Sequence, residues 1–167
     1  HYDTAQLRSH YLIEKVFAPD EVNLTYTMHD RMIAGGVMPV HETVELEPMD
    51  ILRAEYFLER REMGIFNVGG TGVVTAGADE YKMEFKEALY LGRGNRRITF
   101  KSIDPENPAK FYLCSANAHA AYPDHLTTRE NAVKMELGSL EGSNHGVINR
   151  MLVKEVVPTC QLQMGMT

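Results

Sequence analysis

Four consecutive charged residues, Glu59-Arg60-Arg61-Glu62, stand inside an otherwise apolar stretch from residue 56 to residue 64. In a β-strand, alternate side chains point to opposite faces, so Glu59 and Arg61 would share one face and Arg60 and Glu62 the other. Whichever face is covered must bury charge, and a buried charge needs a partner or a ligand. The string predicts a solvated strand edge, an internal ion-pair network, or an anion contact through Arg60 or Arg61.

The densest group of titratable side chains runs from His119 to His125, with Asp124 between the two histidines. This arrangement fits a catalytic or ligand-binding loop, and it equally fits a polar surface loop. The seven histidines form no His-x-His pair, so a metal site would have to be assembled from distant strands. The sequence also lacks a Gly-x-Ser-x-Gly nucleophile elbow and a glycine-rich phosphate loop followed by Lys-Ser/Thr.

Short alternating segments dominate the chain and must position these residues. Strands are predicted at 22–28, 64–68, 73–76, 81–85, 88–91, 98–102, 111–114, 151–157 and 160–167, with a hairpin turn at Gly77-Ala78-Asp79. Short helices are predicted from Thr4, as N-cap, to Val16 and from Pro48 to about Tyr56. Seven or more short strands favour an all-β sandwich or closed barrel.

Composition places the chain among soluble globular proteins. It has 167 residues, 44% of them hydrophobic, and a net charge of −6. Its longest apolar runs are far below the roughly 20 residues of a membrane span, and no basic surface for nucleic acid is expected. Cys114 and Cys160 lie in apolar alternating stretches, so both are expected to be reduced, buried thiols of a cytoplasmic protein.

Several strings along nearly the whole chain resemble the 5-keto-4-deoxyuronate isomerase family, also called 4-deoxy-L-threo-5-hexosulose-uronate ketol-isomerase. The strings are Phe57-Leu58-Glu59-Arg60-Arg61-Glu62, Asn107-Pro108-Ala109-Lys110-Phe111-Tyr112, Ala118-His119 with Tyr122-Pro123, and Thr159-Cys160-Gln161-Leu162-Gln163-Met164-Gly165. The likeness begins at Leu12-Ile13-Glu14-Lys15-Val16-Phe17 and Asp30-Arg31-Met32-Ile33 and continues to the last residue.

The resemblance implies a cytoplasmic enzyme of pectin and glycosaminoglycan breakdown. Members of the family interconvert 5-dehydro-4-deoxy-D-glucuronate and 3-deoxy-D-glycero-2,5-hexodiulosonate. They look like two cupin barrels in one chain, assemble as homohexamers and bind one zinc ion per subunit. Their metal ligands lie on a His-x-His-x4-Glu motif and a later histidine in the second barrel, which for this chain would fall beyond Thr167.

The first barrel then resembles a degenerate copy of the second. Superposing the Glu-Arg-Arg string that follows the family's ligand motif on residues 59–61 places Tyr56, Leu58 and Met63 at the positions of two histidines and the glutamate. The later histidine would fall near Asn95 or Arg96. Because these side chains are poor zinc ligands, no metal site is expected within the chain.

The expected organisation is a metal-free, cupin-like barrel over residues 1–114, an irregular excursion over 115–147, and strands over 148–167 that lead into a second barrel. The ends at His1 and Thr167 suggest a piece of a longer protein. The isomerase would use this part for architecture and assembly, with Gln161 and Met164 as candidate pocket residues and Arg60 or Arg61 as candidates for the substrate carboxylate. The alternatives are a non-catalytic sugar-binding or assembly module, and a non-zinc site built on His119, His125 and a carboxylate.

Overall fold

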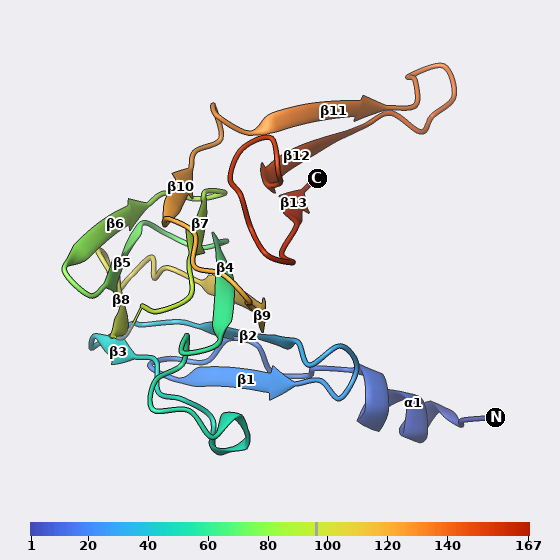
Figure 1. Cartoon of the computed structure of the whole chain (residues 1–167). Coiled ribbons are helices and arrows are strands. Elements are labelled where there is room, and N and C mark those ends of the chain that lie inside the picture. The colour runs from blue at the N-terminus through green and yellow to red at the C-terminus, as the bar shows by residue number, and fades with distance from the viewer. Residues whose placement is uncertain (96) are drawn as a thin grey trace.

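The computed structural model describes residues 1–95 and 97–167 and shows an all-β chain with one short helix at its N-terminus (Figure 1). Within the described residues, the larger sheet has six antiparallel strands in the order β1-β2-β9-β4-β7-β10 and the second has four, β3-β8-β5-β6. The bounds of the large sheet are β1 Val22–Tyr26, β2 Ile33–Val37, β9 Phe111–Asn117, β4 Arg61–Asn67, β7 Ala88–Leu91 and β10 His125–Thr127.

The four-stranded sheet consists of β3 Val44–Glu45, β8 Ile98–Ser102, β5 Gly72–Ala76 and β6 Asp79–Met83. Apolar side chains from both sheets meet in the main core, because alternate residues of each strand point to one face. Among them are Ile65 of β4, Val74 of β5, Phe100 of β8 and Phe111 of β9, all at 0% exposure. The expected all-β, cupin-like fold is confirmed, although the two sheets are not joined by strand pairing in the described part.

The C-terminal part covers the other face of the large sheet. A third sheet of β11 Val133–Leu137, β12 Gly146–Leu152 and β13 Met164–Met166 projects away from the first two (Figure 1). Met151 and Leu152 pack with Phe66 of β4 and Tyr90 of β7 in a second apolar cluster. Strand β4 is therefore buried along its whole length, since both of its faces are covered.

Several predicted elements are confirmed and others need correction. The hairpin β5–β6 turns at Gly77-Ala78, with φ of +63° at Gly77, as the sequence predicts. Helix α1 is shorter than expected, Thr4–Tyr11, and its N-cap is Asp3, which forms a capping box with Gln6. The predicted helix at 48–56 reduces to the 3₁₀ turn η1, Asp50–Leu52.

The region expected to be irregular contains regular structure. Strand β9 continues across residue 114 to Asn117, and strands β10 and β11 lie within 115–147. The predicted strand 151–157 is wrong beyond Leu152, because the amides of Val156 and Val157 donate to the carbonyl of Val153 in a tight turn. The predicted strand 160–167 is reduced to β13.

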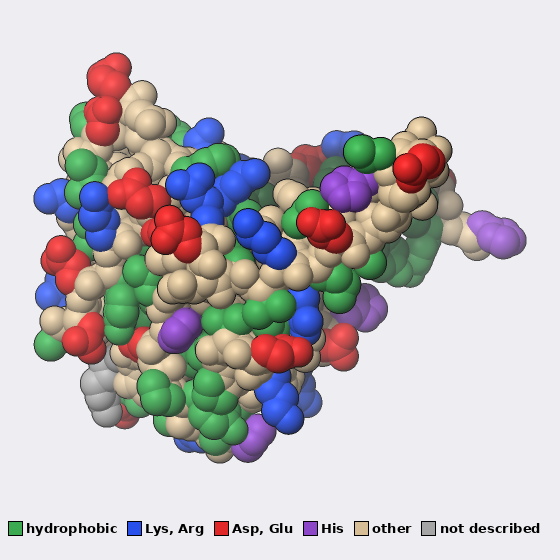
Figure 2. All heavy atoms as spheres, turned by 90° about the horizontal axis from the view of Figure 1, so that it is seen from above, with side chains coloured by type: hydrophobic (Ala, Val, Ile, Leu, Met, Phe, Trp, Pro, Cys, Tyr) green, Lys and Arg blue, Asp and Glu red, His purple; other side chains and the backbone are tan. Residues whose placement is uncertain are grey.

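Among the described residues, no helix is long and apolar enough to cross a membrane. On the face shown in Figure 2, acidic, basic and hydrophobic side chains are interspersed over the surface. This distribution agrees with a mixed, mildly acidic composition.

Candidate functional site

The charged string enters the large sheet only at its second half. Residues 56–60 form turns, and strand β4 begins at Arg61. Arg61 shares its face with Met63 and Ile65, which lie in the main core, whereas Glu62 shares its face with Phe66, which packs against the C-terminal part. Both charges are buried, Arg61 at 3% exposure and Glu62 at 0%. The solvated-edge explanation is therefore wrong for these two residues.

Glu62 binds the C-terminal segment through its carboxylate. Oε1 accepts hydrogen bonds from the backbone N–H of Gln161 at 2.7 Å and of Leu162 at 2.9 Å. Oε2 accepts from the backbone N–H of Cys160 at 2.8 Å and from the hydroxyl of Tyr90 at 2.7 Å. Three consecutive N–H groups thus converge on one buried carboxylate, which satisfies its charge without a cation. We call this arrangement the Glu62 cradle.

The environment of Tyr90 agrees with this geometry. Tyr90 is fully buried on β7, opposite Gly64 of β4. Burial and the hydrogen bond to Glu62 raise the pKa of the Tyr90 hydroxyl well above its ordinary value. Tyr90 therefore remains a neutral donor to the carboxylate.

Arg61 is held by neutral acceptors and not by a carboxylate. Its Nε donates to Ser115 Oγ at 3.1 Å and its Nη1 to Asn117 Oδ1 at 2.8 Å. Its Nη2 donates to the carbonyls of Arg31 at 2.7 Å and of Ser115 at 2.9 Å. Burial lowers the pKa of the guanidinium from its ordinary value. An ion-pair network inside the string is therefore wrong for Arg61 and Glu62, whose partners lie on opposite faces.

A surface hollow of about 190 Å³ opens next to Arg61. Its polar lining comes from Tyr26, Arg31, Arg60, Arg61 and Asn117, and the rest is the segment around η1. We call it the arginine hollow. Arg60 Nη2 donates to the carbonyls of Leu52 at 2.9 Å and Arg53 at 3.0 Å, so this side chain ties the η1 segment to the start of β4.

The other pocket candidates from the sequence lie on the C-terminal segment. The Gln161 side chain is exposed although its backbone N–H is fixed by Glu62. Met164 is half-buried on strand β13, over Gly64, where a Cβ would contact its Sδ atom. The Glu62 cradle therefore fixes the backbone of the segment that carries both residues, on the face of the sheet opposite to the arginine hollow.

In the loop from His119 to His125, Asp124 accepts hydrogen bonds that hold neighbouring segments together. Asp124 Oδ1 accepts from the Gly92 N–H and the Asn95 amide, both at 2.9 Å. Its Oδ2 accepts from the Tyr81 hydroxyl at 3.3 Å, and burial raises the pKa of Tyr81 to about 12. His119 is exposed and His125 is half-buried in β10. No hydrogen bond or ion pair between the described side chains joins these histidines to Asp124.

The positions that align with the family's metal-ligand motif hold side chains with other surroundings. Leu58 and Met63 are fully buried in the main core, and Tyr56 is half-buried. Asn95 is a partner of Asp124, and Arg96 lies outside the described residues. Among residues 1–95 and 97–167, no group of three or more His, Cys, Asp or Glu could hold a metal ion.

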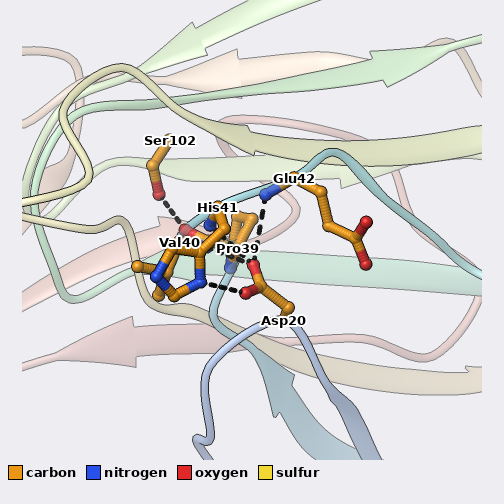
Figure 3. A network of polar contacts seen from close by, with 6 residues as sticks. All are labelled: Asp20, Pro39, Val40, His41, Glu42 and Ser102. Carbon is orange, nitrogen blue, oxygen red and sulfur yellow. Dashed lines mark hydrogen bonds and ion pairs between the residues drawn. The ribbon is translucent and has the colours of Figure 1, made fainter.

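A second polar network resembles a catalytic triad only in its residue types (Figure 3). Asp20 Oδ2 binds His41 Nδ1 at 2.6 Å, and Oδ1 accepts from the N–H groups of Val40 and His41 at 2.7 and 2.9 Å. These bonds hold the pKa of Asp20 far below its ordinary value. The Ser102 hydroxyl donates to the Pro39 carbonyl and not to His41. The network therefore ties loops together and activates no nucleophile.

Both cysteines are free, as expected, but their burial differs. Cys114 is buried, and burial raises the pKa of its thiol. Cys160 is only half-buried, so the expectation that both are buried is wrong for this residue.

Sequence reasoning singled out the charged string but missed how it functions. Glu62 was not a candidate site residue, and its three backbone partners lie 98 to 100 positions further along the chain. The sequence did indicate that one face of this strand must bury a charged side chain, and this was the signal that could have pointed to Glu62. Arg60 and Arg61, the candidates for the substrate carboxylate, both line the arginine hollow.

Comparisons with known proteins agree with the resemblance. The model of the "KduI/IolB family" matches residues 11–167. The chain is 60% identical over 166 residues to "4-deoxy-L-threo-5-hexosulose-uronate ketol-isomerase 1" of Bacteroides thetaiotaomicron, covering 99% of this chain and 59% of that protein. It is 51% identical to the ketol-isomerase of the same name from Formosa agariphila, with the same coverage. The chain thus spans about three fifths of the length of these relatives.

Solved structures show a related fold at low sequence identity. An IolB-like protein from Salmonella typhimurium superposes with a TM-score of 0.57 at 13% identity, covering 76% of this chain and 46% of that one. The Ylba protein from E. coli gives a TM-score of 0.52 at 11% identity, with 74% and 45% covered. At such identities, the likeness supports the fold alone.

Proposed function

Since the chain belongs to the KduI/IolB family, we propose that it is part of a 4-deoxy-L-threo-5-hexosulose-uronate ketol-isomerase. The reaction interconverts 5-dehydro-4-deoxy-D-glucuronate and 3-deoxy-D-glycero-2,5-hexodiulosonate. The observation that carries the proposal is the 60% identity over 99% of the chain to a relative of that name. The setting we propose is cytoplasmic breakdown of pectin and glycosaminoglycan uronates by a homohexamer.

A ketol isomerisation moves a proton between adjacent carbons through an enediol. It needs a general base, a group that polarises the carbonyl, and a cation for the carboxylate. We propose that zinc supplies the polarisation in the full-length enzyme, from ligands outside residues 1–167. The described residues do not include a donor set for it.

The contribution of this chain is to position its C-terminal segment. The Glu62 cradle fixes the backbone at residues 160–162 and leaves the Gln161 side chain exposed. Met164 packs over Gly64 and fixes the start of β13. We propose Gln161 and Met164 as pocket residues of the complete enzyme. Arg60 and Arg61 stay proposed contacts for a substrate carboxylate, but they lie at the arginine hollow on the opposite face of the sheet and therefore apart from that pocket.

The test is an isomerase assay on two proteins: the full-length protein that carries this sequence, and residues 1–167 alone. The full-length protein should convert the substrate, lose activity in a chelator and recover it with zinc. Residues 1–167 should show no turnover and bind no stoichiometric zinc by metal analysis. Turnover by the full-length protein that survives complete chelation would contradict the zinc assignment, and turnover by residues 1–167 would show that the chemistry is misplaced.

A non-catalytic assembly or sugar-binding role is the second candidate for residues 1–167 themselves. It is favoured by the four hydrogen bonds that Glu62 accepts from Tyr90 and residues 160–162, because they give this buried carboxylate a structural role. Inactivity of the full-length protein toward the uronate in the presence of zinc would support this candidate over the isomerase.

A further inference from the structure

The arginine hollow lies where three parts of the large sheet meet. Tyr26 ends β1, Arg61 begins β4 and Asn117 ends β9, and Arg61 and Asn117 are direct partners across the β4–β9 pair. Arg31 belongs to the tight β1–β2 turn, where its φ of +55° places it in the left-handed region. The η1 segment lines the hollow with apolar side chains. The walls are therefore fixed by strand pairing and by a turn.

Arg61 presents to this hollow a positive charge that no carboxylate among its hydrogen-bond partners balances. It is 3% exposed, and its four protein acceptors, two carbonyls, a hydroxyl and a side-chain amide oxygen, are all neutral. A buried cation held only by neutral groups is costly, because dipoles compensate desolvation less completely than an opposite charge does. These bonds use four of the five N–H groups of a guanidinium, which leaves one Nη1 hydrogen for a ligand.

Arg31 and Arg60 add two further positive charges to the rim. No Asp or Glu is among the described residues that line the hollow. Arg60 has a carboxylate near it, Glu59 at 3.8 Å, but the two side chains are 55% and 30% exposed, so the pair is weak. The Tyr26 side chain adds a hydroxyl to the wall. The hollow is thus cationic and offers several N–H and O–H donors.

The size limits what can enter. A volume of about 190 Å³ is below the roughly 300 to 1,000 Å³ of pockets for drug-sized ligands. It suits a group of a few heavy atoms, and guanidinium groups match the geometry of carboxylate and phosphate oxygens.

We propose that the arginine hollow binds a small oxyanion, a carboxylate or phosphate group, with Arg61 as its buried anchor and Arg31 and Arg60 as its rim. The site lies on the face of the sheet opposite to the Glu62 cradle. It does not depend on the proposed isomerase activity, because its evidence is the charge and geometry of the hollow alone.

The test measures thermal stability of the full-length protein that carries this sequence in rising sodium phosphate or sodium acetate, with ionic strength held constant by NaCl. Binding to the folded state raises Tm with anion concentration. The matched variants are Arg31→Gln and Arg60→Gln. Arg31→Gln is the cleaner one, because Arg31 accepts the Arg61 bond through its backbone carbonyl, which the substitution keeps.

Each rim variant should raise the half-saturating anion concentration roughly tenfold, the factor expected for loss of one charge-assisted hydrogen bond. Arg97→Gln is the control, because it removes one positive charge outside the hollow, at an exposed ion pair with Glu45. It should change the half-saturating anion concentration by less than about twofold. A rise in Tm with acetate alone identifies a carboxylate as the ligand group, and a rise with phosphate alone identifies a phosphate. The proposal is overturned if neither salt raises Tm beyond the NaCl control, or if both rim variants respond as the wild type does.

Discussion

Replacing Glu62 with Gln keeps the size of the side chain but removes the negative charge and one of the two acceptor oxygens on which the C-terminal segment depends. Each carboxylate oxygen now accepts two hydrogen bonds, and at least one backbone N–H donor would face an amide NH₂ after the substitution. Hydrogen bonds to a charged group contribute about 1.5 to 3 kcal/mol each, and a buried donor left without a partner costs a similar amount. We expect Glu62→Gln to lower the free energy of unfolding by about 3 kcal/mol.

The measurement combines thermal unfolding with amide hydrogen exchange. For a domain of this size, about 3 kcal/mol corresponds to a fall in Tm of roughly 6 to 12 °C. The amides of residues 160–162 should lose exchange protection more than those of the β5–β6 hairpin, because only the former donate to Glu62. Tyr90→Phe removes a single bond and should cost about 1 kcal/mol.

Glu45→Gln is the matched control, since Glu45 is exposed and its ion-pair partner among the described residues is Arg97 at the surface. Its effect on Tm should be within about 2 °C. The reasoning is refuted if Glu62→Gln unfolds at the wild-type temperature and residues 160–162 exchange as slowly as before.

Three further outcomes follow from the same contacts. Gly64→Ala should destabilise the protein by about 1 to 3 kcal/mol, because the new Cβ would clash with Met164 Sδ. Adding Met164→Ala should recover part of this loss, as measured by thermal unfolding. A double variant that recovers none of it would contradict the packing of Met164 over Gly64. Asp20 has a lowered folded pKa, so its contribution to stability is full above the unfolded value of 3.8 and is lost as pH falls below it. Asp20→Asn should therefore flatten urea-unfolding stability between pH 5 and about pH 3, and an unchanged slope would contradict this. Iodoacetamide should modify half-buried Cys160 faster than buried Cys114, whose thiol pKa is raised, as peptide mass spectrometry would show; the reverse order would be a contradiction.

Local patterns predicted the local structure well. Alternation and a Gly-containing turn were enough for the β5–β6 hairpin, because both strands and their turn lie within twelve residues. The same reasoning failed at β11. Val133, Met135 and Leu137 do alternate with Lys134 and Glu136, but the strand is mostly exposed and is paired only with β12. Pro123 and the glycines Gly138, Gly142 and Gly146 led us to expect an irregular segment and therefore outweighed a correct signal.

The candidate site was less predictable because its partners are distant in sequence. The string 59–62 could be recognised as a place where charge must be compensated, yet neutral carbonyls and three backbone N–H groups perform that compensation. Backbone groups carry no residue-type signature, so no spacing of side chains reveals them. Arg60 and Arg61 were identifiable because guanidinium groups beside an apolar run have few alternatives to a ligand or a buried acceptor.

Arg61 and Glu62 are neighbours that face opposite sides of one buried strand, and this fixes how β4 can be threaded between β9 and β7. A slip of one residue in one direction would put Glu62 in the place of Arg61, among acceptors that a carboxylate cannot use, and Met63 opposite the three N–H groups that now hold Glu62. A slip in the other direction would put Arg61 opposite those N–H groups. A guanidinium has no acceptor and a thioether is only a weak one, so in either direction the hydrogen bonds that hold residues 160–162 would be lost. Two adjacent charges thereby make misaligned assembly of the sheet far less stable than the native alignment, a discrimination that the apolar residues of the strand supply only weakly.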